Sequence, residues 1–403
     1  MRILIFNPEE KGHNFPFLRA LIPAIKGLGC DITLALTKQG TDSTEFQAHL
    51  APISGQFQTD GSVAHAPGRR RRIAEMASAV QRNNAEHLLV PNAEPLLAAL
   101  GVYATVGYQG IPAGVTSEFT LIRADFAYPP LTLEQRAWFW GKEQFINALP
   151  EATLSLIDPV AYENIQRRRT CLAARIRLLP ELLDNVAPIE KDEARTRLGL
   201  PRLGRILGCT GRLDLRKGVD QLIRAFARAE LKADDRLLLA GEATPEVLNL
   251  FRTELSTVVR GGRIILLNRY LTDEELNWVL CASDLVAATY LTSHLAPSAI
   301  INKSAVIGRP VLASRFGWSD YMVPEFGLGT LTDVTDLRIL SRDVALALDQ
   351  SGAFVQSPRS VRLREYLSPR NFAASWTAGI AERLGRPVPE YKEWDWVLGS
   401  AAQ

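Results

Sequence analysis

The stretch that decides the fold is GCTGRLDLRKGVDQLIRAF, residues 208–226. Its apolar start is typical of the end of a buried strand, and its last third is typical of an amphipathic helix. The short connection between them carries Gly211, Arg212 and Lys217. Glycine lets a ligand approach the backbone closely, arginine offers a planar pair of donors, and lysine offers a mobile point charge. The connection therefore predicts either a clamp on a diphosphate or a plain turn, in which Arg212 pairs with Asp214 and Lys217 is solvated.

The composition is ordinary for a soluble globular protein. The chain has 403 residues, enough for two domains, and its net charge of +2 gives no global field that would favour nucleic acid. The four cysteines show no metal-ligand spacing, which indicates small core residues in a reducing compartment. The start MRILIF leads directly into NPEEKG, unlike a signal peptide, and no apolar stretch approaches the roughly 20 residues of a membrane span. We therefore expect a cytoplasmic protein.

Apolar runs alternate with helical patterns along both halves of the chain, which predicts an α/β protein with two doubly wound parallel sheets. In the first half we expect strands at 2–6, 31–36, 87–90, 113–116 and 153–157, and helices at 15–28, 70–81, 94–100 and 133–148. In the second half we expect strands at 205–209, 236–240, 263–267, 284–288 and 311–314, and helices at 219–229, 245–258, 272–282 and 302–307. The first strand is followed by NPEEKGHN and not by GxGxxG, which disfavours a nicotinamide or flavin enzyme.

A seam rich in charge and proline, residues 179–204, separates the two alternations. We expect a first Rossmann-like domain at 1–185 and a second at 186–370. A final helix and tail at 371–403 should cross back, with Trp394 and Trp396 docking on the first domain. Ligands of such sheets bind outside the carboxyl ends of the strands, and two sheets in series can face each other across a cleft.

The order of motifs in the second half resembles a known family. GRLDLRKG is followed by a strand ending in Gly241, then by LTDEEL, ASDL and GRPVLAS, with DEARTRLGLP before them and LSPRNFAASW after them. This order resembles the nucleotide-binding domain of GT-B glycosyltransferases, most closely the retaining enzymes of family 4 (glycosyltransferase group 1). The resemblance covers approximately residues 188–348. It implies that the first domain faces the acceptor and the second binds a nucleotide-sugar.

The resemblance assigns roles to several residues of the second domain. Arg212 and Lys217 match the pair that binds the donor diphosphate, where charge develops as the glycosidic bond breaks. The segment that carries Asn268, Tyr270 and Leu271 matches the place where the backbone of the family reads the nucleobase. The glycines Gly211 and Gly241 belong to the same donor site. Neither a metal nor any other cofactor is implied, because the nucleotide-sugar is itself the substrate.

One motif of the family is missing. Members usually carry Glu-x7-Glu before GxPVxAS, but Lys303 stands at the second position and residues 293–295 at the first. Two alternatives follow. His294, Ser298 and Asn302 bind the donor hydroxyls while Lys303 contacts phosphate, or the donor site has decayed and Lys303 only faces solvent.

The first domain contributes three further candidates and one basic cluster. Gly12 and His13 lie in the loop after the first strand, where a helix start would favour phosphate or the acceptor, although a lone loop histidine is commonly a plain surface residue. Glu118 would follow the strand at 113–116 and, as a catalytic residue, orient the acceptor hydroxyl or the sugar; otherwise it would form a cap or an ion pair. The cluster in GRRRRIAEM consists of Arg69, Arg70, Arg71 and Arg72. It is either a solvated helix face or a peripheral contact with the inner face of a membrane, where anionic lipids attract cations.

These observations predict a hexosyltransferase-like enzyme of polysaccharide or glycoconjugate biosynthesis. It would move a sugar from a nucleotide-sugar to a sugar, lipid-linked or small-molecule acceptor without a metal, with retention if the family resemblance holds. The alternative is a noncatalytic protein of the same fold that binds a glycan, a nucleotide or a partner subunit. Base, sugar, acceptor and linkage are left open.

Overall fold

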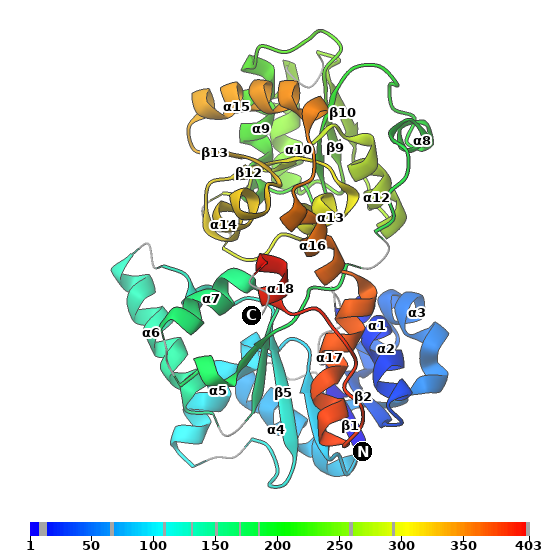
Figure 1. Ribbon diagram of the computed structural model, residues 1–403, viewed down its shortest axis with the longest axis vertical. Coiled ribbons are helices and arrows are strands. Elements are labelled where there is room, and N and C mark those ends of the chain that lie inside the picture. Colours follow the sequence, from blue (N-terminus) through cyan, green and yellow to red (C-terminus); the bar gives the residue numbers. More distant parts are fainter. Residues whose placement is uncertain are drawn as a thin grey trace. The chain divides into compact units, whose positions relative to one another are not determined.

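The computed structural model describes residues 1–7, 14–64, 68–107, 110–129, 132–149, 152–168, 171–183, 186–257, 261–291 and 295–399. The chain divides into two compact units, coloured along the sequence in Figure 1. Unit 1 comprises Met1–Leu182 and Ser368–Trp394, and unit 2 comprises Leu183–Leu367 and Asp395–Gln403. Within the described ranges, no helix is long and apolar enough to cross a membrane.

Unit 1 is built on a seven-stranded sheet in which every paired strand is parallel, in the order β3-β2-β1-β4-β5-β6-β7. The strands are β1 (Arg2–Phe6), β2 (Asp31–Thr37), β3 (Gln58–Val63), β4 (His87–Val90), β5 (Thr116–Leu121), β6 (Thr153–Leu156) and β7 (Ile176–Leu178). The helices are α1 (Asn14–Gly27), α2 (Lys38–Thr41), α3 (Thr44–His49), α4 (Arg69–Arg82), α5 (Glu94–Thr105), α6 (Leu133–Asn147), α7 (Pro159–Arg168) and α17 (Pro369–Arg383), with short 3-10 turns η1 (Ala51–Gln56), η2 (Asp125–Ala127) and η3 (Ala173–Arg175).

Unit 2 is built on a six-stranded parallel sheet in the order β10-β9-β8-β11-β12-β13. The strands are β8 (Ile206–Thr210), β9 (Arg236–Ala240), β10 (Ile264–Leu267), β11 (Leu285–Ala288), β12 (Val311–Ser314) and β13 (Gly329–Thr332). The helices are α8 (Lys191–Arg197), α9 (Val219–Arg228), α10 (Pro245–Arg252), α12 (Asp273–Ala282), α13 (Ala299–Ile307), α14 (Gly317–Phe326), α15 (Leu337–Gln350) and α16 (Pro358–Tyr366), with the turns η4 (Leu215–Lys217) and η5 (Ser351–Ala353). A last helix, α18 (Trp394–Leu398), begins at the final residue that unit 1 contributes.

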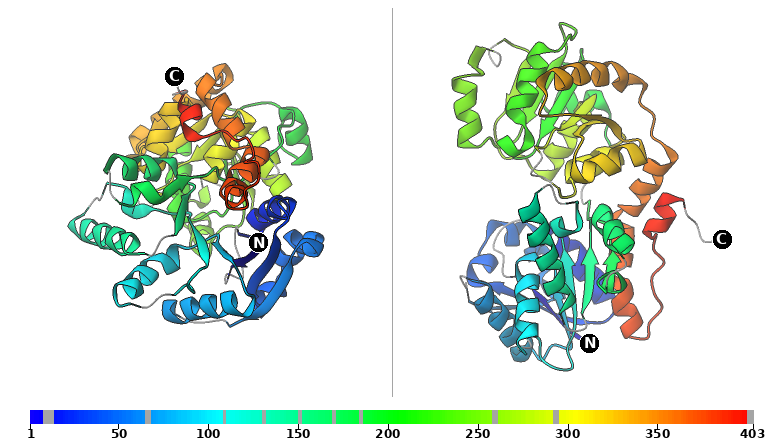
Figure 2. Two further views of the ribbon diagram at one scale, coloured as in Figure 1. Left: turned by 60° about the horizontal axis from the view of Figure 1, so that its bottom comes forward. Right: turned by 90° about the vertical axis from the view of Figure 1, so that its left-hand side faces the viewer.

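Helices lie on both faces of each sheet (Figures 1 and 2), so both faces of a strand are buried. In unit 2, Leu237 and Leu239 belong to one hydrophobic cluster, while Leu238 and Ala240, between and beside them, belong to a second. Successive side chains of a strand point to opposite faces, so a strand covered on both sides becomes a continuous apolar run. The prediction of two doubly wound parallel sheets is confirmed.

The fold differs from the prediction in several places, and strands β7 and β13 were not expected at all. The strand expected at 113–116 is wrong, because β5 occupies Thr116–Leu121. Strand β3 has the polar sequence QTDGSV, so an apolar-run criterion could not find it. At the end of the chain, Trp394 donates a hydrogen bond to Glu163 of α7 (3.1 Å), but Trp396 is assigned to unit 2 and not to unit 1.

Candidate functional site

The loop between β8 and α9 folds back on itself through Lys217. Lys217 Nζ donates to the carbonyl of Thr210 at 2.7 Å, and the Lys217 amide donates to the Asp214 carboxylate at 3.1 Å. Gly211 adopts a φ of +84°, and a Cβ at this position would lie 2.7 Å from Lys217 Nζ. Burial lowers the pKa of Lys217 from its ordinary value. The ammonium is therefore fixed beside the bare backbone of Gly211, at the carboxyl end of β8.

A second glycine loop lies directly against the first. Gly241 follows β9 with a φ of +141°, and a Cβ at this position would lie 2.0 Å from the carbonyl oxygen of Gly211. We call this contact between Gly211 and Gly241 the glycine layer. The Leu213 amide donates to Glu242 O (2.9 Å), and the Thr244 amide donates to Leu213 O (3.0 Å). The loops after β8 and β9 are thus joined by backbone hydrogen bonds on either side of Leu213.

The loops after β10 and β11 are tied to the same layer. Asn268 Oδ1 accepts a hydrogen bond from the Ala243 amide at 2.9 Å. The Thr289 hydroxyl donates to Lys217 O at 3.1 Å, and the Leu291 amide donates to Arg216 O at 2.8 Å. Four loops at the carboxyl edge of the sheet of unit 2 therefore form one hydrogen-bonded assembly.

Arg212 belongs to the same loops but, unlike Lys217 and Arg216, does not help to hold them together. Its side chain is exposed, and it makes no ion pair or hydrogen bond with the described residues. The alternative that Arg212 pairs with Asp214 is wrong, because Asp214 pairs with Arg216 (3.5 Å) and caps η4. Hydrogen bonds from its own amide and from Thr244 lower the pKa of Glu246, and Arg212 adds a smaller electrostatic contribution in the same direction.

The start of α13 carries the residues that stand where the Glu-x7-Glu motif is missing. Ser298 caps the helix and lies 3.0 Å from the hydroxyl of the buried Tyr290. Asn302 is also buried, one turn further on. Lys303 is half-buried and forms no ion pair or hydrogen bond with any described residue. Of these three side chains, Lys303 is the one left available to a ligand.

The predicted base-reading segment presents one large exposed ring. Tyr270 is 79% exposed, while Leu271 is buried in the core. Asn268 is exposed but its side-chain oxygen already holds the loop after β9. The segment therefore begins with Asn268, whose side chain holds a neighbouring loop, and it exposes the aromatic ring of Tyr270.

Four predicted site residues are not part of the site described above, three because they are not described and one because it is buried in a sheet. Gly12, His13 and His294 lie outside the described residues. Glu118 does not follow a strand as expected but lies within β5, where it is buried and its Oε1 accepts a hydrogen bond from Ser155 at 2.6 Å. This placement inside the sheet argues against contact with an acceptor, so we leave Glu118 out of the site.

The sequence did not point to two residues that lie in or next to the loop, Arg216 and Tyr290. Arg216 lies over the ring of Tyr290 with its guanidinium carbon 5.6 Å from the ring centroid, which links η4 to the loop after β11. Arg216 stands beside Lys217 in the quoted motif, and Tyr290 closes the run ASDLVAATY. A polar or aromatic residue just after an apolar strand was the signal that could have identified Tyr290.

Comparison with known proteins agrees with this geometry. Residues 204–347 match the family model described as Glycosyl transferases group 1. Among solved structures, Anabaena HepE in complex with UDP and glucose has a TM-score of 0.66 at 18% identity, over 96% of this chain and 99% of that chain. Sucrose-phosphate synthase from Thermosynechococcus elongatus has a TM-score of 0.67 at 17% identity, over 95% and 99% of the two chains. A glycosyltransferase from Rickettsia africae has a TM-score of 0.67 at 11% identity, over 96% and 99%.

No curated protein sequence matches the chain. The structural likeness establishes a GT-B fold, and residues 204–347 of unit 2 match the glycosyltransferase group 1 family model. Fold and domain together define the class: a GT-B glycosyltransferase. The narrower resemblance to family 4 stays a prediction.

Proposed function

We propose that unit 2 binds a nucleotide-sugar through its glycine layer and that the protein transfers the sugar to an acceptor hydroxyl. The observation that carries this proposal is the pair of cations at the carboxyl edge of the sheet. Lys217 is fixed against the Gly211 backbone, and Arg212 has no partner among the described residues. HepE, of the same fold, was solved with UDP and with UDP-glucose. A nucleoside diphosphate is the group that these two cations would bind here.

In this reaction the site has to stabilise a diphosphate as the leaving group. Negative charge on the diphosphate increases as the bond to the anomeric carbon breaks, so donors fixed in advance stabilise the transition state more than the ground state. Lys217 uses one N–H on Thr210 and keeps two for phosphate oxygens, and Arg212 can bind two oxygens at once. Two such cations would let transfer proceed without a metal. Retention of configuration is proposed from the family resemblance alone.

Lys303 distinguishes two versions of the donor site. It lies on α13 in place of the missing acid, with no partner among the described residues. If Lys303 contacts donor phosphate, Lys303→Glu weakens nucleotide binding because it reverses a favourable charge. If the donor site has decayed, Lys303→Glu strengthens binding because a carboxylate can accept hydrogen bonds from sugar hydroxyls.

Calorimetric titration with UDP, GDP, ADP and TDP tests the proposal. A hydrogen bond to a charged group is worth about 1.5–3 kcal/mol, so Arg212→Ala and Lys217→Met should each weaken binding about ten- to a hundredfold. Methionine keeps the apolar stem of Lys217 and removes only its charge. The double variant should deviate from additivity, since both cations contact one ligand.

Arg228→Ala is the matched control, because Arg228 is exposed on α9 and unpaired within the described chain. Equal affinity in Arg212→Ala, Lys217→Met and Arg228→Ala would overturn the clamp. Catalysis is tested separately, by screening sugar nucleotides for hydrolysis and for transfer. Nucleotide binding without turnover of any donor would favour the noncatalytic alternative.

A further inference from the structure

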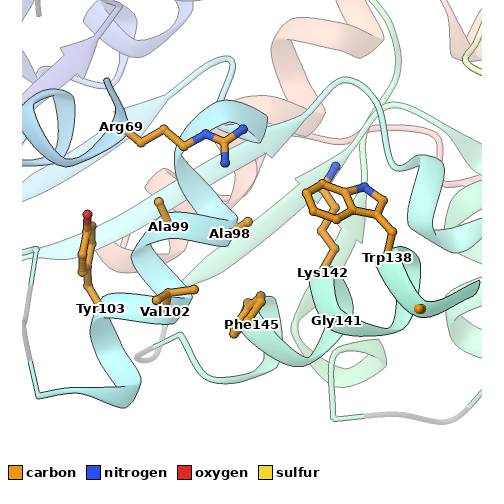
Figure 3. A pocket seen from close by; sticks show the side chains of 10 residues that line it. Arg69, Ala98, Ala99, Val102, Tyr103, Trp138, Gly141, Lys142 and Phe145 are labelled. Carbon is orange, nitrogen blue, oxygen red and sulfur yellow. The ribbon is translucent and has the colours of Figure 1, made fainter. Parts of the chain in front are cut away.

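Unit 1 carries an open apolar groove of about 370 Å³ between α5 and α6. Figure 3 shows Phe145 and Trp138 on α6, Val102 and Tyr103 on α5, and the side chain of Arg69 reaching over from the start of α4. Every residue of the groove belongs to unit 1, whereas the glycine layer belongs to unit 2. The proposed function therefore leaves this groove unexplained.

Helix α6 has a second apolar face that the fold does not need. Its core face consists of Phe139, Glu143 and Ile146, all buried. Trp138 and Phe145 lie on another face and are 63% and 39% exposed. Residues three and four apart share one face of a helix, and Trp138, Gly141 and Phe145 follow that spacing. One buried face is sufficient to hold a surface helix, so the second face points to an external apolar partner.

The hollow itself results from small residues. Gly101 allows the two helices to approach, since a Cβ there would lie 1.8 Å from the carbonyl oxygen of Phe145. Beyond this crossing point, Ala98, Ala99 and Gly141 line the groove, and a Cβ at Gly141 would meet nothing within 4 Å. The groove is therefore a space between helices already held at contact distance.

Two cations, Arg69 and Lys142, line the groove, and Arg69 begins a run of arginines. Arg69, Arg70 and Arg71 at the start of α4 are exposed and form no ion pair or hydrogen bond with the described residues. Lys142 lines the groove on its other side. The acids of the same helices are Glu75, Glu94, Glu134 and Glu143. Glu143 pairs with Arg168 at 3.2 Å, and burial raises the pKa of Glu94 to about 7, which reduces its negative charge. An occupant with an apolar body and an anionic head would match both parts of this surface.

We propose that the groove binds an anionic phospholipid of a bilayer, with an acyl chain between α5 and α6 and the headgroup phosphate on Arg69 and its neighbours. Two further apolar side chains of α6 are exposed on a part of the helix that does not line the groove. Trp140 is 66% exposed and Leu133 is 82% exposed, both on α6. Tryptophan is favoured at membrane surfaces because its ring is apolar and its N–H can reach water.

Flotation with phosphatidylglycerol-rich vesicles, compared with pure phosphatidylcholine vesicles, tests the proposal on the full chain. The protein should bind the anionic vesicles at least tenfold more tightly, and high salt should weaken this binding. The variant Arg69→Glu/Arg70→Glu/Arg71→Glu should lose most of it. Arg228→Glu on α9 of unit 2 is the charge control and should bind like the unchanged protein. Equal binding of both vesicle types would overturn the proposal.

The groove is tested by filling it. Gly141→Leu should weaken vesicle binding about fivefold or more, because the leucine occupies the space of the acyl chain. It should not harm folding, since its Cβ meets open space and leucine favours a helix more than glycine does. Trp138→Ser should also weaken binding, whereas Leu203→Ser, at an 82% exposed leucine of unit 2, should not.

Unchanged vesicle binding by Gly141→Leu would exclude the groove as the lipid site. A second copy of the chain is the competing occupant. A dimer in light scattering that Gly141→Leu or Trp138→Ser converts to a monomer would overturn the lipid proposal in favour of self-association.

Discussion

A buried histidine of unit 1 links the stability of the protein to pH. His87 is the first residue of β4 and is fully buried, with Nδ1 2.8 Å from the Thr116 hydroxyl. Burial, helped by the positive charge of Arg383, lowers the pKa of His87 to about 4. The imidazole is therefore neutral in the folded protein at a pH where an unfolded chain would already protonate it.

This pKa predicts a loss of stability in mild acid. Between pH 6.5 and pH 4 the unfolded chain binds a proton at His87 that the folded chain does not, so the free energy of unfolding falls as the pH falls. At 1.36 kcal/mol for each unit of pKa shift, the loss is about 3 kcal/mol. Urea denaturation at several pH values should show it, and His87→Gln should remove this part of the slope. An identical slope in both proteins would contradict the prediction.

At the scale of elements, the sequence predicted the strands that carry apolar side chains on both faces. It did not correctly place a strand that buries polar side chains. Strands β8, β9, β11 and β12 are continuous apolar runs and lie within a residue or two of their expected positions. Strand β5 reads TSEFTL and was misplaced, because Glu118 is satisfied by Ser155 of a neighbouring strand. A partner brought in by the fold removes the cost of burying that carboxyl group, and no local pattern reveals such a partner.

For the candidate site, too, the sequence predicted some features and could not predict others. Residue types and spacing pointed to Gly211, Arg212 and Lys217, since a glycine and cations between a strand and a helix are a local signal. The glycine layer could not be predicted, because the contact of Gly241 with Gly211 depends on the register of β8 against β9. The role of Asn268 in holding the loop after β9 likewise arises only when three strands lie side by side.

The glycine layer gives a prediction at this scale. Gly241→Ala should lower stability and weaken nucleotide binding strongly, because its Cβ would lie 2.0 Å from Gly211 O and its φ of +141° is unfavourable for alanine. Gly262→Ala is the control: its φ of +76° imposes strain, but a Cβ there meets nothing within 4 Å. Thermal melts and calorimetry on both variants separate the two effects. Similar losses of binding in both would show that close packing of the loops is not what the site requires.

At the scale of the whole molecule, the chain completes unit 1 only after it has made the whole sheet of unit 2. Helix α17 follows the six strands of unit 2 in sequence, yet it packs beside α1 in unit 1 (Figure 1). Phe372 and Trp376 of α17 are buried in the core of unit 1, and their ring centroids lie 5.2 Å and 4.7 Å from that of Phe17. Trp376 Nε1 also donates to Pro180 O at 3.4 Å. The residues between Leu183 and Leu367, by contrast, contain all six strands of the second sheet.

This order predicts unequal behaviour of the two halves when they are made separately. The fragment 183–367 should be soluble and resist proteolysis, because its sheet and both hydrophobic clusters are complete. The fragment 1–182 should aggregate or stay loosely packed, because removal of α17 exposes the apolar side chains under Phe372 and Trp376. Adding a peptide of residues 368–394 should restore a cooperative thermal transition to it. In the full chain, Trp376→Ala should cost about 3–5 kcal/mol, the usual range for loss of a large buried aromatic side chain, and should lower the melting of unit 1 selectively. Calorimetry of the full chain, combined with proteolysis of each fragment, measures this. A stable, cooperatively folded 1–182 fragment without the peptide would show that α17 only covers unit 1 and does not complete its core.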